Sequence, residues 1–83
     1  NPWFDAEQHA EQAHQFYEAG QWDKALQALR RALAVNPEQS EWHFGMGLTL
    51  DAMGQHSLAI ESYRRVLELR GEDTEVLLHL AAT

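Results

Sequence analysis

Apolar residues recur every three or four positions along most of this chain, which is the spacing of one face of an α-helix. In residues 22–35, for example, they are Trp22, Ala25, Leu26, Leu29, Ala32 and Leu33. Gly20, Gly54 and Gly71 separate such segments, and glycine is common just past a helix end. The pattern predicts five helices, over residues 6–19, 22–35, 41–53, 56–69 and 74–82. Asn1 as a cap and Pro2 at the first helical position would start the first helix earlier.

The helical pattern itself repeats with a period of 34 residues. A shift by this period superimposes identical residues: Glu7 on Glu41, His9 on His43, Gly20 on Gly54, Gln21 on Gln55, Ala25 on Ala59, Arg30-Arg31 on Arg64-Arg65, and Leu33 on Leu67. A fixed period of this length is the signature of stacked helical repeats. We therefore expect an all-α domain with units at residues 6–39 and 40–73 and a partial unit or capping helix at 74–83.

Small residues mark where two helices of a unit must approach closely. Ala13 and Gly47 on the first helices are expected to face Ala25 and Ala59 on the second helices. A large side chain there would push the helix axes beyond their usual separation of about 8–10 Å. Trp42 is expected to wedge between the two units, with stacking on a ligand as the alternative.

The repeating units resemble the tetratricopeptide repeat family. The second half of that repeat is matched by Gly20-x-Trp22-x-x-Ala25-Leu26-x-x-Leu29-x-x-Ala32-Leu33-x-x-x-Pro37. The second unit is matched by Met46-Gly47-x-x-Leu50 and by Gly54-x-His56-x-x-Ala59-Ile60-x-x-Tyr63. The departures are His9 and His43 in place of an early aromatic residue, and Gly71 where proline is common. The resemblance implies an α-solenoid of antiparallel helix pairs in a right-handed superhelix. It also implies a protein-interaction module, a scaffold or adaptor, whose first helices line a concave groove.

The resemblance places one stripe of each first helix in that groove. The expected partner-binding residues on this stripe are Glu7, His14, Tyr17, Glu41, Phe44, Leu48, Asp51 and Leu78. For Phe44 and Leu48, core packing beneath a segment that is missing from this chain is an equal alternative. The first helices carry acidic residues and no lysine or arginine, so we expect an amphipathic protein or peptide partner that is neutral or basic. The groove stripe lacks the cationic residues with which family members hold a C-terminal carboxylate.

Charge and composition exclude several other classes of function. The net charge of −7 and the absence of a basic stripe disfavour nucleic acids and anionic membranes as partners. The chain has no cysteine and no apolar run of about 20 residues, so neither a thiol site nor a membrane span is expected. The cytoplasm is favoured over the periplasm. Because the chain starts at Asn1 without methionine, we expect it to be a piece of a longer protein.

No catalytic residues, metal or cofactor are expected. His9 and His14 are five positions apart and lie on different helix faces, and two ligands do not make a zinc site. Glu7 and Glu11 are interpreted as a solvated acidic pair. The arginine pairs are interpreted as local ion-pair partners, Glu61 with Arg65 and Arg64 with Glu68.

Two alternative functions stay open from the sequence. The stretch from Phe44 to Tyr63 is also similar to repeat-type chaperones of bacterial type III secretion, which would make the chain a chaperone for an export substrate. Alternatively, the repeats are a structural or regulatory segment of a larger enzyme. The last helix, rich in Val76, Leu77, Leu78 and Leu80, has little polar surface and is a candidate for self-association.

Overall fold

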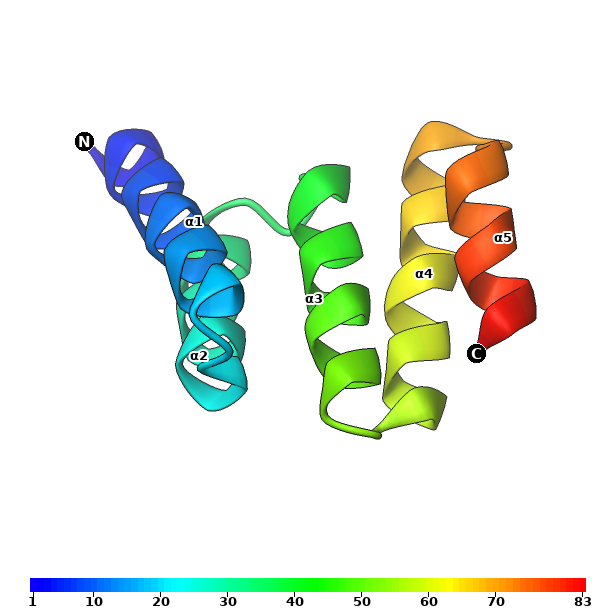
Figure 1. Ribbon diagram of the computed structural model, residues 1–83. Helices are drawn as coiled ribbons and strands as arrows, with labels where there is room; N and C mark the ends of the chain where they lie inside the picture. The colour runs from blue at the N-terminus through cyan, green and yellow to red at the C-terminus, as the bar shows by residue number, and fades with distance from the viewer.

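The computed structural model describes residues 1–83 and contains five α-helices and no strand (Figure 1). The helices are α1 (Pro2–Glu18), α2 (Trp22–Val35), α3 (Ser40–Ala52), α4 (His56–Arg70) and α5 (Thr74–Ala82). The all-α prediction is therefore confirmed, including the earlier start of the first helix. The side chain of Asn1 accepts a hydrogen bond from the Trp3 amide at 3.0 Å, which fixes that start.

The turns inside the two helix pairs have the same geometry. Gly20 and Gly54 adopt φ angles of 74° and 79°, a left-handed conformation that glycine adopts without a steric penalty. The amide after each glycine donates to a carbonyl in the preceding helix: Gln21 to Phe16 at 2.8 Å and Gln55 to Leu50 at 2.9 Å. The 34-residue period thus corresponds to a repeated structural unit.

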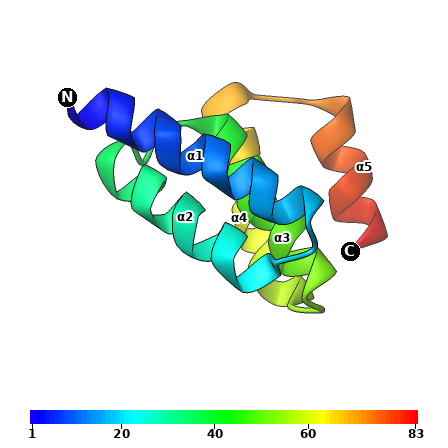
Figure 2. The same cartoon turned by 60° about the vertical axis from the view of Figure 1, so that its left-hand side comes forward.

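The helices form antiparallel pairs that stack in one direction. The first pair is α1 with α2, the second is α3 with α4, and α5 packs against α4 at the far end of the stack (Figures 1 and 2). The second pair joins the first mainly through α3, which packs on α2 and touches α1. This is the expected α-solenoid architecture.

The core consists of two apolar clusters, each closed by the first helix of the next unit. The first cluster comprises Ala6, Ala13, Ala28, Leu29, Ala32 and Trp42. The second comprises Leu26, Leu50, Ala59, Tyr63, Val66 and Val76. Trp42 belongs to α3 but is buried in the first cluster, which confirms its expected position between the units. Val76 of α5 has the corresponding role in the second cluster.

The closest approach within the second pair differs from the expected one. A β-carbon at Gly47 would meet the ring of Tyr63, not Ala59, with Cδ1 at 2.6 Å and Cζ at 2.8 Å. Tyr63 is fully buried and corresponds by the repeat period to Leu29 of the first pair. The larger ring in α4 is therefore accommodated by the absence of a side chain in α3.

The surface ion pairs also differ from the predicted ones. Arg65 pairs with Glu68 at 3.0 Å rather than with Glu61, and Arg64 forms no ion pair. Of the two carboxylates near Arg65 along the helix, that of Glu68, at i+3, lies within ion-pair distance of the guanidinium.

No helix combines the length and apolar character that crossing a membrane requires.

Candidate functional site

A groove of about 400 Å³ lies between α1 and α3, the first helices of the two units. We call it the α1/α3 groove. Its lining residues are Ala10, Glu11, Ala13, His14, Tyr17, Glu18, Leu29, Glu41, Trp42, Gly45, Leu48 and Thr49. The lining includes both apolar side chains and carboxylates, so that an amphipathic ligand would find both kinds of contact.

The floor of the groove lies against a glycine. A β-carbon at Gly45 would lie 3.4 Å from Cδ1 and 3.5 Å from Cδ2 of Leu29. Leu29 of α2 thus reaches the backbone of α3 at Gly45 and lines the groove. The indole of Trp42, which is 8% exposed, adds to this apolar floor.

Carboxylates predominate among the charged groups of the groove. Glu11, Glu18 and Glu41 contribute carboxylates, and no lysine or arginine lines the groove. His14 Nε2 lies 3.4 Å from a carboxylate oxygen of Glu18, and both side chains are exposed. The Thr49 hydroxyl donates to the Gly45 carbonyl at 2.8 Å. The groove therefore presents negative charge to a ligand.

Four of the eight predicted partner-binding residues line this groove: His14, Tyr17, Glu41 and Leu48. Tyr17 and Leu48 are half-buried. The Tyr17 ring meets the Trp22 ring edge-on, with 5.1 Å between ring centroids, which holds the tyrosine at the end of the groove.

The other four predicted residues lie outside the α1/α3 groove. Phe44 packs between α4 and α5, with ring centroids 5.8 Å from Tyr63 and 5.3 Å from His79. Phe44 therefore contacts other helices of this chain rather than the α1/α3 groove. Leu78 is 65% exposed on α5, and Glu7 is exposed on α1.

Asp51 is the fourth residue outside the groove, and it joins three helices. Its carboxylate accepts hydrogen bonds from the Tyr63 hydroxyl of α4 and from the Thr83 hydroxyl beyond α5, both at 2.8 Å. His56 Nδ1 lies at the same distance. Burial alone would raise the pKa of Asp51, but the hydrogen bonds from His56, Thr83 and Tyr63 together hold it below its ordinary 3.8. Burial and the neighbouring Asp51 raise the pKa of Tyr63.

The eight predicted residues did not include the groove floor. Neither Leu29 nor Gly45 was among those eight residues. A signal was present in the repeat period, because Gly45 occupies the position of Glu11 in the first unit. That exchange of a long side chain for none opens the space that Leu29 enters.

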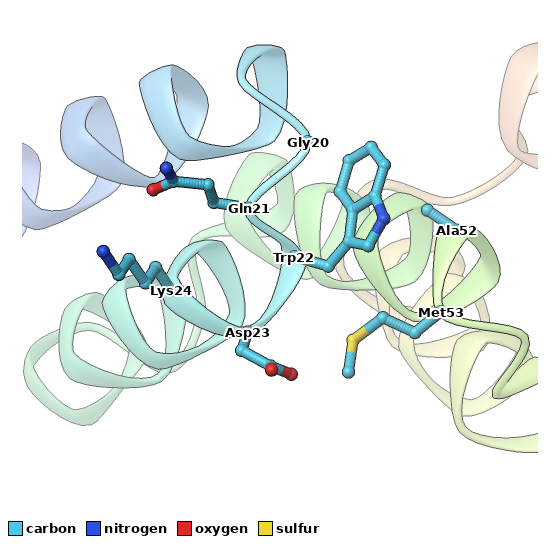
Figure 3. A pocket seen from close by; sticks show the side chains of 7 residues that line it. All are labelled: Gly20, Gln21, Trp22, Asp23, Lys24, Ala52 and Met53. Carbon is cyan, nitrogen blue, oxygen red and sulfur yellow. The ribbon is translucent and has the colours of Figure 1, made fainter.

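A second hollow, of about 580 Å³, lies at the turn end of the stack. It is formed by residues 20–24, at the start of α2, and by Ala52 and Met53, at the end of α3. Figure 3 shows the Trp22 indole directed into the space between the two segments. None of the predicted partner-binding residues lines this hollow. Nowhere do three or more histidine, aspartate or glutamate side chains gather as metal ligands would.

Comparisons with known proteins agree with this architecture. Residues 10–74 match the family model described as tetratricopeptide repeat. Two proteins named probable biofilm formation methyltransferase WspC are similar: that of Pseudomonas aeruginosa is 37% identical over 65 residues and that of Pseudomonas putida 33% over 64. The matches cover 78% and 77% of this chain but only 15% of each relative.

A solved structure shares the fold. The crystal structure of MamA superimposes with a TM-score of 0.92 at 23% identity, over 99% of this chain and 47% of that one. Repeats of this type generally mediate protein–protein interactions. Since the family model matches most of its length, this chain belongs to the tetratricopeptide repeat family.

Proposed function

We propose that this chain is a protein-interaction module that holds an amphipathic peptide or helix, neutral or basic, in the α1/α3 groove. The observation that carries the proposal is the composition of that groove. Glu11, Glu18 and Glu41 contribute carboxylates beside an apolar floor, and no lysine or arginine lines the groove. An amphipathic helix with lysine or arginine beside its apolar stripe matches this arrangement in both polarity and charge.

The apolar part of the proposal is tested by two Leu→Ala variants. Leu48 is half-buried in the groove, whereas Leu78 is exposed on α5 outside it. The probe is a 15-residue helical peptide of leucine and lysine, and its affinity is measured by fluorescence anisotropy. Burying a leucine side chain against the peptide contributes about 1.5 kcal/mol, so Leu48→Ala should weaken binding about tenfold. Leu78→Ala should change it less than twofold.

The charged part is tested with a matched pair of Glu→Gln variants. Glu41 lines the groove, and Glu75 occupies the same position of the repeat in α5 but lies outside it. Glu41→Gln should reduce affinity and weaken its salt dependence, while Glu75→Gln should leave both nearly unchanged. Equal effects within each pair, with helicity preserved, would rule out the α1/α3 groove as the binding site.

The names of the two Pseudomonas relatives favour a second candidate. Because this chain spans about 15% of each protein named a methyltransferase, the repeats would serve as an interaction segment of a larger enzyme. The full-length gene product decides between the candidates. A methyl-transfer assay on that product, with and without residues 1–83, should show activity that the repeats localise or regulate but do not perform. Full activity in the repeats alone would contradict this assignment.

A further inference from the structure

The second helices carry a charge opposite to that of the whole chain. α2 contains three basic residues and one acidic residue, and α4 contains three basic and two acidic ones, a net charge of +3 against −7 for the chain. All the lysine and arginine residues of the protein lie on these two helices. We therefore asked whether contacts within the chain neutralise the positive charge of α2 and α4.

Intramolecular ion pairs account for only part of this positive charge. Arg65 pairs with Glu68, and Arg70 contacts Ser40 and Asp73. Arg30, Arg31 and Arg64 are exposed and form neither an ion pair nor a side-chain hydrogen bond within the chain. Three guanidinium groups are thus free to bind an external anion.

One of these free arginines borders a hollow with an apolar floor. The hollow measures about 240 Å³ and lies over α3, between Arg30 of α2 and Arg65 of α4. Met46 and Leu50 of α3 and Leu58 of α4 line it, and Leu58 is an exposed large apolar side chain, at 44%. Glu61 is the one carboxylate at this site, on the α4 side. We call it the α2/α4 hollow.

We propose that the α2/α4 hollow is a second docking site, which binds an acidic segment of a partner protein. A partner carboxylate would pair with Arg30, whose planar guanidinium can donate two parallel hydrogen bonds to it. An apolar side chain of the same segment would cover Leu58. Glu61 repels a carboxylate on the α4 side, so the partner's negative charge is directed toward α2. The site is independent of the α1/α3 groove, which attracts the opposite charge.

The test compares charge reversal at two exposed arginines. Arg30 borders the hollow, whereas Arg64 is exposed, unpaired and outside it. The probe is a 15-residue helical peptide of glutamate and leucine. Its affinity is measured by fluorescence anisotropy, and its binding site is mapped by amide shifts in NMR spectra of the labelled chain. Arg30→Glu should weaken binding at least tenfold, and Arg64→Glu, with the same change in net charge, less than threefold.

The outcomes separate this proposal from its competitors. Amide shifts at Arg30, Leu58 and Arg65 support it, and a further loss in Leu58→Gln supports the apolar contact. Equal weakening by both reversals, or shifts confined to residues of the α1/α3 groove, would overturn it. Tighter binding of a 20-nucleotide single-stranded DNA than of the acidic peptide would overturn it too, because the surface would then be a nucleic-acid site. Leu48→Ala should leave acidic-peptide binding unchanged, so failure here is distinct from failure of the proposed function.

Discussion

Replacing Gly47 by alanine tests how tightly the second helix pair is packed. On propensity alone, Gly→Ala inside a helix stabilises by about 1 kcal/mol. The new β-carbon, however, would lie 2.6 Å from Cδ1 and 2.8 Å from Cζ of Tyr63, and nearer still to Cε1. Separations below 3.0 Å are essentially never seen for real β-carbons, so either the ring or the helix axis has to move.

The Tyr63 ring has no free space into which it can move. It is fully buried, it stacks on His79 with centroids 5.6 Å apart, and its hydroxyl donates to Asp51 at 2.8 Å. Overpacking of this kind costs about 3 kcal/mol at the upper end of its usual range. After the gain in propensity, the expected net loss in the free energy of unfolding is about 2 kcal/mol. For a domain of this size, that lowers the melting temperature by roughly 8–16 °C.

The assay is urea and thermal unfolding followed by circular dichroism at 222 nm, and α3 offers a matched control. Gly45→Ala places its β-carbon 3.4 Å from Leu29, an ordinary van der Waals distance, so this variant should be neutral or slightly more stable. Adding Tyr63→Leu to Gly47→Ala recreates the pairing of Ala13 with Leu29 in the first unit. The double variant should lose less free energy of unfolding than the sum of the losses in Gly47→Ala and Tyr63→Leu alone. Equal stabilities for the two alanine variants would refute the steric argument.

Two further predictions concern stability. Because the pKa of Asp51 is lowered on folding, its ionised form stabilises the fold fully above the unfolded-state pKa, and this contribution is lost as the pH falls through the lower folded value. The free energy of unfolding of the wild type, measured by urea titration, should therefore exceed that of Asp51→Asn most at pH 6, and the difference should shrink below about pH 4. A difference that does not change with pH would contradict this role of the Asp51 carboxylate. Trp42→Ala should lower the free energy of unfolding by about 3–5 kcal/mol, because Trp42 is only 8% exposed. Trp3 is 57% exposed, so Trp3→Ala should lower it by less than about 1 kcal/mol. Equal losses would argue against a wedge of Trp42 between the units.

The sequence by itself determined the repeating unit and the helices. Helix formation depends on short-range spacing, on caps and on glycines, all of which are local in the chain. The 34-residue period adds long-range information, because residues such as Gly20 and Gly54 must have equivalent neighbours if the units stack. For the same reason Trp42 was correctly assigned to the contact between the units.

Only the tertiary structure decided which side chains of the first helices remain free. Helical periodicity places Phe44, Leu48 and Asp51 near one another on α3, but it does not say which neighbouring helix each of them meets. Tyr63 of α4 contacts both Phe44 and Asp51, and Thr83 at the chain end donates a further hydrogen bond to Asp51, while Leu48 lines the groove between α1 and α3. Successive side chains of a helix point in directions about 100° apart, so those of one stripe can meet different neighbouring helices. Whether a given side chain lies in a groove or in a core therefore depends on how the units stack.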